Sequence, residues 1–259
     1  MVRIGGYTEL RGWDDRLVLA RHDGAGGGEV LLRYVAGELR DRARRQVAVL
    51  STVESQYLVR VREFVEEEHG AAVVLDAPRA VPLPALLAHG RVVTPEAALY
   101  LLRGSLCGLA AVHAAGVAHS GYRPDAVLVD LAGQVRLVDF GLEPPPGYAS
   151  AVADVHAAVA AFVVFLTADT TFTAPADLIA ATPVTLRELV RAGLSRDVDM
   201  VALLASLDEV ATAQFGGAWA ERGRLWLAVG ARELRVAELA GPGRGGRDSG
   251  LLAIERQRL

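Results

Sequence analysis

The chain has 259 residues, of which 52% are hydrophobic and 22% are charged, and its formal net charge is −4. This balance excludes a disordered chain and gives no reason to expect nucleic acid as a partner. All 27 basic residues are arginine, because the sequence contains no lysine, and it contains no asparagine either. Chemistry that needs lysine is therefore excluded: a Walker-A loop, a Schiff base, or a lysine on a nucleotide phosphate.

The single cysteine, Cys107, excludes an intramolecular disulfide and a cysteine-cluster zinc site. Its apolar helical surroundings favour a buried structural thiol. Residues 1–15 contain no apolar run of the kind found in a signal peptide. The longest apolar run, Ala157–Ala168, is shorter than the roughly 20 residues that a membrane span needs. We therefore expect a cytoplasmic protein without a membrane span.

The first third of the chain is predicted to form a small sheet with one inserted helix. The strands are expected at Arg16–Arg21, Val30–Val35, Leu58–Val65 and Ala71–Leu75. The helix is expected at Glu38–Thr52, where apolar residues recur at helical spacing. Three prolines follow, Pro78, Pro82 and Pro84, and they predict a linker.

The remainder is predicted to be mainly helical. Residues 94–96 (TPE) form a helix start, because a capping hydroxyl precedes a proline at the first helical position. A short strand hairpin is expected at Ala126–Asp130 and Val135–Val138. Further helices are expected at Asp154–Leu166, Leu186–Ala192, Val201–Val210 and Ala218–Leu239. Residues 241–259 begin with a Gly/Arg-rich stretch, which predicts a flexible linker and a short tail.

Residues 110–143 read AAVHAAGVAHSGYRPDAVLVDLAGQVRLVDFGLE, and residues 154–168 read DVHAAVAAFVVFLTA. The first segment resembles the catalytic loop H-R-D-L-K-P-x-N, the hairpin and the D-F-G magnesium motif of bacterial Ser/Thr protein kinases. The second resembles the buried helix of the same family, and the resemblance extends over residues 6–207. It implies an α+β, protein kinase-like fold of two lobes. The parts are a small β-sheet N-lobe at 1–77, a mainly helical, shortened C-lobe at 78–240, and the linker and tail at 241–259.

The same resemblance implies that the phosphotransfer residues of the family are missing from this chain. The strand lysine of the family aligns with Arg33, and its helix glutamate partner aligns with Gln46, so this ion pair is lost. The catalytic aspartate aligns with Gly121, which has no side chain, and the loop lysine aligns with Arg123.

The resemblance also implies that one of the two magnesium-ligand positions is lost. The asparagine that holds the second magnesium aligns with Ala126, so Asp139 alone survives among the metal ligands. One carboxylate without its partner ligand is a weak magnesium site. The resemblance therefore implies no metal, no cofactor and no catalytic residue in this chain.

The nucleotide pocket is expected to be blocked. Leu31 stands where the family has a small residue against adenine, and Leu75 aligns with the gatekeeper. Pro78 aligns with the hinge residue that donates its N–H to adenine, and proline has no N–H. In place of the phosphate-covering glycine loop the chain has Asp14 and Asp15, which would repel phosphate.

The chain is also too short to form the segment that binds the peptide substrate in this family. Only residues 142–153 are left for the activation segment, and they lack the A-P-E motif of the family.

The internal apolar side chains of the family fold are nevertheless retained. The resemblance places Leu50, Val61, His119 and Phe140 in the internal stack, seated on Asp154. Each buried apolar side chain contributes roughly 1.5–3 kcal/mol. In this interpretation His119 is a packed core histidine and not a base.

These features together imply a pseudokinase that acts as a scaffold or allosteric regulator of partner proteins. For such members of the family the resemblance implies an active kinase, an FHA-domain protein or an actinobacterial envelope-synthesis protein as partner. The alternative is a divergent phosphotransferase, or a nucleotide- or metabolite-binding enzyme, that uses the remnant cleft around Asp139 with Arg33 and Arg123. A third hypothesis is recruitment through phosphorylation of the threonine-rich Thr167–Thr173.

Overall fold

The computed structural model of the protein describes residues 2–24, 27–140, 150–172 and 174–240. Contacts divide the chain into two units. The first contains the residues up to Glu54 and Val59–Pro78, and the second contains Ser55–Leu58 and Arg79–Leu239. The linker and tail predicted at 241–259 lie outside the described residues.

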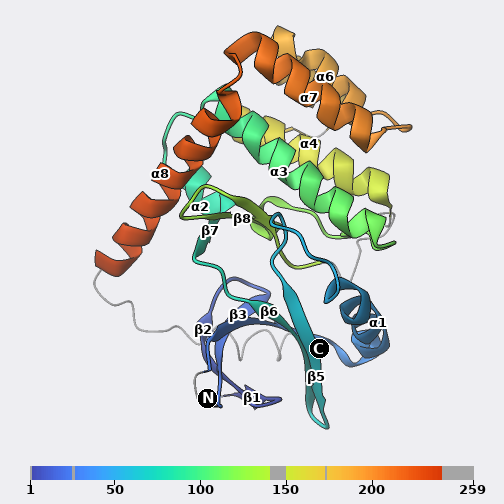
Figure 1. The fold of residues 1–259 in the computed structure, drawn as a ribbon, viewed down its shortest axis with the longest axis vertical. Coiled ribbons are helices and arrows are strands. Elements are labelled where there is room, and N and C mark those ends of the chain that lie inside the picture. The colour runs from blue at the N-terminus through green and yellow to red at the C-terminus, as the bar shows by residue number, and fades with distance from the viewer. Residues whose placement is uncertain (1, 25–26, 141–149, 173, 241–259) are drawn as a thin grey trace. The chain divides into compact units, whose positions relative to one another are not determined.

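The first unit is a six-stranded antiparallel sheet with one helix (Figure 1). The strands are β1 (Arg3–Ile4), β2 (Tyr7–Gly12), β3 (Leu17–His22), β4 (Glu29–Tyr34), β5 (Val61–Glu67) and β6 (Gly70–Asp76), in the spatial order β1-β2-β3-β4-β6-β5. Helix α1 (Arg40–Leu50) follows β4 and buries Ala43, Val47 and Leu50. It is shorter than predicted at both ends, because Gly37–Leu39 form a 3-10 turn and the helix ends at Leu50.

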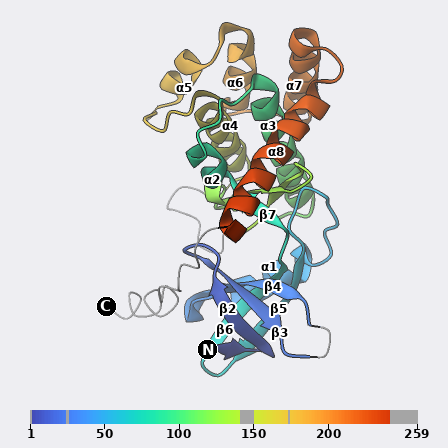
Figure 2. The ribbon, with the colours of Figure 1, turned by 90° about the vertical axis from the view of Figure 1, so that its left-hand side faces the viewer.

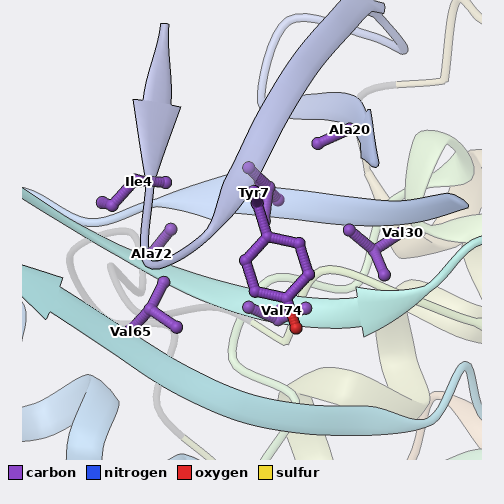
Figure 3. Packing of buried hydrophobic residues seen from close by; sticks show 8 residues of the cluster. Ile4, Tyr7, Ala20, Val30, Val65, Ala72 and Val74 are labelled. Carbon is purple, nitrogen blue, oxygen red and sulfur yellow. The ribbon is translucent and has the colours of Figure 1, made fainter. Parts of the chain in front are cut away.

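The sheet curls until its first and last strands meet. The N–H of Gly5 donates to Glu67 Oε1 at 2.7 Å, and this contact joins the β1 turn to β5. The interior holds a cluster of apolar side chains, in which the Tyr7 ring lies among its neighbours (Figure 3). The cluster consists of Ile4, Tyr7, Ala20, Val30, Leu32, Val65, Ala72 and Val74. The Tyr7 hydroxyl donates to Glu63 Oε1 at 2.6 Å, and burial raises the pKa of Tyr7 to about 12.

Substituting Gly5 by alanine is expected to destabilise the first unit by about 2–4 kcal/mol. Gly5 has a φ of +56°, and a Cβ there would lie 2.6 Å from Val65 Cβ. The matched control is Gly12→Ala, because a Cβ on Gly12 meets no atom within 4 Å. Urea unfolding measures both variants. Equal midpoints for the two would show that the β1–β5 contact does not hold the sheet closed.

The second unit is mainly helical and carries a three-stranded antiparallel sheet in the order β7-β8-β9 (Figure 1). Its strands are β7 (Ala80–Pro82), β8 (Val127–Asp130) and β9 (Val135–Leu137). Its helices are α2 (Leu83–Ala88), α3 (Pro95–Ala114), α4 (Ala151–Thr167), α5 (Pro175–Ala181), α6 (Arg187–Gly193), α7 (Met200–Phe215) and α8 (Trp219–Ala240).

Helix α3 is the core of this unit. It begins as predicted, because Thr94 is its N-cap and the Thr94 hydroxyl accepts the N–H of Ala97. Gly104 and Gly108 allow it to approach β9 closely: a Cβ on Gly104 would lie 2.7 Å from Val135 Cβ. Among the described helices only α3 has the length and apolar composition of a membrane span, and 67% of that stretch is buried inside the unit, as in a core helix.

The structure corrects the predicted proline linker. Residues that follow Pro78 form β7 and then α2. Pro82 is the extended N-cap residue of α2, and Pro84 lies in its first turn. The first turn of a helix has no internal partner for its N–H groups, so proline is tolerated there. The same reason explains α5, which the sequence did not predict and which begins at Pro175.

Candidate functional site

The loop that follows α3 is tied to the first turn of α4 by one buried carboxylate. Asp154 is 0% exposed and accepts the backbone N–H of His119 at 2.8 Å and that of Ser120 at 2.9 Å. His113 Nε2 lies 2.9 Å from the same carboxylate. Helix α4 starts at this point because the Ser150 hydroxyl caps it by accepting the N–H of Ala153. Asp154 therefore fixes the backbone from which the loop side chains project.

His119 is fully buried in this loop. Its Nε2 lies 3.2 Å from the carbonyl of Val138, which can only accept, so Nε2 carries the proton. Nδ1 is then unprotonated and has no hydrogen-bond partner among the described residues. Burial lowers the pKa of His119, which keeps the ring neutral. The ring packs 5.0 Å from that of Phe140 and 5.9 Å from that of Tyr122. This environment suits a structural histidine.

Arg123 and Asp139, which the sequence predicts to line the remnant cleft, form an ion pair. Arg123 Nη2 lies 2.7 Å from Asp139 Oδ2. The Asp139 side chain is 1% exposed, whereas that of Arg123 is 24% exposed. Asp139 also has a φ of +56°, a left-handed conformation that costs an L-residue about 1–2 kcal/mol. The guanidinium therefore neutralises the carboxylate and helps to hold it in an unfavourable backbone conformation.

The residues around Asp139 do not fit a magnesium ion. The Arg123 guanidinium already donates to one of the two Asp139 carboxylate oxygens. Ala126, at the position of the second ligand, is a buried methyl group, and Gly121 offers no side chain. Asp125 is half exposed, with its carboxylate 3.8 Å from Arg123 Nε, so it approaches the same cation. Among the described residues no group of three or more His, Cys, Asp or Glu side chains is arranged to hold a metal.

In the first unit, Arg33 and Gln46 lie on β4 and α1. Arg33 Nη1 donates to the carbonyl of Tyr34 at 2.9 Å. The Oε1 atom of Gln46 is buried and has no hydrogen-bond donor among the described residues. A neutral amide cannot replace the negative charge that a glutamate would present at this position. Gln46 therefore supplies no negative charge with which Arg33 could form the strand-to-helix ion pair of an active kinase.

Two of the residues predicted to block the pocket lie on neighbouring inner strands of the sheet. Leu31 on β4 is paired with Leu75 on β6, and they are 0% and 2% exposed. Leu75 is also paired with Val61 on β5. Pro78 follows β6 and supplies no N–H. Within the first unit these positions form an apolar surface without a backbone donor at residue 78.

The turn between β2 and β3 is closed by its own carboxylate. Asp14 Oδ1 accepts the N–H of Arg16 and that of Leu17, each at 2.7 Å. The N–H groups of Trp13 and Asp14 donate to the carbonyl of Leu17 at 2.9 and 3.2 Å. Backbone N–H groups at such turns are natural donors for an anion. Here the Asp14 carboxylate is itself the anion that these N–H groups bind. From the sequence alone, Asp14 is predicted only to repel phosphate.

The predicted internal stack divides between the units. Leu50 and Val61 are buried in the first unit, and His119, Phe140 and Asp154 are brought together in the second. The predicted activation segment, residues 142–153, lies outside the described residues except for its last four, which cap and begin α4. In the threonine-rich stretch Asp169 accepts both the N–H and the hydroxyl of Thr171, whereas Thr173 lies outside the described residues.

Part of the chain matches a known protein family. Residues 32–153 match the protein kinase domain model. The serine/threonine-protein kinase PkaB of Streptomyces coelicolor is 33% identical over 132 residues, which are 48% of this chain and 30% of that protein. The serine/threonine-protein kinase PknL of Mycobacterium tuberculosis is 31% identical over 111 residues, 42% of this chain and 28% of that protein. The match therefore spans less than a third of each of these relatives.

The fold has a counterpart among solved structures. The crystal structure of Rad53 1-466 in complex with AMP-PNP superimposes with a TM-score of 0.63 at 16% identity, over 77% of this chain and 64% of that one. At this identity the likeness concerns the fold alone. The expected fold class is confirmed: the chain contains a protein kinase-like domain, with a β-sheet N-lobe and a helical C-lobe, whose homologues include Ser/Thr protein kinases.

Proposed function

We propose that this domain is a pseudokinase, which does not transfer phosphate and acts as a scaffold or allosteric regulator of other proteins. The observation that carries the proposal is the ion pair between Arg123 and the buried carboxylate of Asp139. In an active kinase the corresponding aspartate holds magnesium, and a second cation on the same oxygen opposes metal binding by charge repulsion. The relatives are named as kinases and so do not themselves support inactivity. The proposal therefore depends on the residues of this chain.

Three further features support the proposal independently. Gly121 has no side chain that could accept a proton from a substrate hydroxyl. The Asp14 carboxylate occupies two N–H groups of the β2–β3 turn. Leu31 and Leu75 bring apolar bulk to adjacent strands. Each feature alone weakens phosphotransfer. Together they remove the proton acceptor, occupy N–H donors that could bind the phosphates, and fill the space of the adenine ring.

The alternative of a divergent phosphotransferase gains little from this geometry. That hypothesis needs Arg123 to receive a phosphorylated ligand near Asp139. The guanidinium lies between two carboxylates instead, 2.7 Å from Asp139 and 3.8 Å from Asp125. These two carboxylates would repel an approaching phosphate, which makes Arg123 a weak anchor for it.

A phosphotransfer assay tests the proposal. The pure chain is incubated with radiolabelled ATP, with magnesium or manganese, and with a generic protein substrate. The expected result is no incorporation above that of Asp139→Asn, a variant that keeps a similar shape and reports contaminating kinases. Label that is transferred by the wild-type chain and lost in Asp139→Asn would overturn the proposal.

A further inference from the structure

Helix α8 is fixed to the second unit along one face. Trp219, Leu227 and Ala231 are buried on that face. Gly223 permits close approach, because a Cβ there would lie 2.3 Å from the carbonyl oxygen of Glu96. Figure 2 shows the helix running past α2 and α3. The C-terminal helix is therefore part of the packed domain, with a defined outer face.

That outer face carries a second apolar stripe. Leu225, Val229 and Val236 are 48%, 41% and 64% exposed. Their spacing places them within about 40° of one another on an α-helix, opposite the buried face. They are three of the nine exposed large hydrophobic side chains among the described residues. A helix that docks by one face ordinarily carries polar residues on the other, so this stripe indicates a contact that the single chain does not make.

Charged side chains line both sides of this apolar stripe, and their order along the helix bears on what the stripe can bind. One side carries Glu221 near the N-terminal end and Arg232 near the C-terminal end. The other side carries the reverse order, Arg222 and then Glu233. Such a pattern is complementary to itself: when two copies of the helix run antiparallel, each acid meets a base on both sides. Glu221, Arg222 and Glu233 are 57%, 47% and 49% exposed, so a second chain can reach them.

We propose that α8 pairs antiparallel with α8 of a second copy of this chain, centred near Leu227. This register sets Leu225 against Val229 of the second copy. The same register brings Arg222 to within one residue of the level of Glu233 of the second copy, and Glu221 to within one residue of the level of Arg232. Arg222 and Glu233 already form ion pairs within their own unit, with Glu96 at 3.2 Å and Arg91 at 3.0 Å. Pairing of two copies would extend these networks across the interface.

Sedimentation velocity of the whole chain, from low micromolar to several hundred micromolar, tests the proposal. A concentration-dependent dimer is expected. Val229→Glu should weaken the dimer by about tenfold or more, because it buries a charge in the apolar stripe. The matched control is Val201→Glu, the same change at a 78% exposed valine of α7, which should leave dimerisation unaltered. Circular dichroism verifies that each variant is folded.

A charge swap tests the antiparallel register. Arg222→Glu should weaken the dimer by placing two acids together, and adding Glu233→Arg should restore it. A chain that is monomeric throughout would overturn the proposal. A dimer that Val229→Glu does not weaken, or that Val201→Glu weakens equally, would also overturn it. The proposal would also be overturned if the chain stayed monomeric and α8 bound a helix of a different protein.

Discussion

Replacing Arg123 by alanine is expected to lower the free energy of unfolding by about 3–5 kcal/mol. The substitution removes the guanidinium that lies 2.7 Å from the Asp139 carboxylate, whose side chain is only 1% exposed. The carboxylate then keeps its buried negative charge with one hydrogen-bonded cation fewer. The left-handed backbone of Asp139 loses part of its support at the same time. Urea unfolding followed by circular dichroism measures the loss.

The matched surface control is Arg191→Ala. The partner of Arg191 is Glu188, which is 83% exposed, so this substitution should change stability by less than about 1 kcal/mol. A second variant, Arg123→Ala with Asp139→Asn, removes both charges and should recover part of the loss, because residue 139 then carries no buried negative charge. If Arg123→Ala costs no more than Arg191→Ala, the pair does not hold the loop as proposed.

The second large effect is expected at Asp154. Asp154→Ala leaves the buried N–H groups of His119 and Ser120 without their acceptor and removes the partner of His113. Each unsatisfied buried group costs about 1–3 kcal/mol, so the total loss should reach about 3–5 kcal/mol. Thermal unfolding measures it. Near-ultraviolet circular dichroism should also change, since Tyr122 and Phe140 pack on the His119 ring.

Asp199→Ala is the control for Asp154. Asp199 also accepts two backbone N–H groups, those of Val201 and Ala202, but at the exposed N-terminus of α7. Water can satisfy these groups, so the cost should be about 1 kcal/mol. Similar losses for the two substitutions would contradict a special structural role for Asp154.

Much of the fold could be predicted from local patterns, and the misses have identifiable causes. The start of α3 followed from Thr94 and Pro95, because capping and proline placement are local effects. Helix α2 was missed because Pro82 and Pro84 are also typical of a linker. Only the buried neighbours of Leu83 and Leu86 decide between the two, and those neighbours come from distant parts of the sequence.

The site could be predicted in its parts but not in its contacts. Alignment identified Arg123 and Asp139 separately as remnants of a catalytic region, and nothing in their spacing predicted that they form an ion pair. A contact between two loops depends on tertiary packing around them. For Asp14 a signal was available, since an aspartate at a turn often accepts the N–H two or three residues ahead. That signal predicts the closed turn between β2 and β3.

The most direct test of the proposed loss of nucleotide binding and activity is a thermal-shift titration with ATP, with and without magnesium, alongside an active Ser/Thr kinase as positive control. A ligand at about 100 times its dissociation constant adds about 2.7 kcal/mol of stability, which is visible as a raised melting temperature. The ion pair of Arg123 and Asp139 and the apolar Leu31 and Leu75 predict no shift in either condition. A magnesium-dependent rise would contradict that prediction, because it would show that Asp139 leaves Arg123 to bind the metal with its nucleotide.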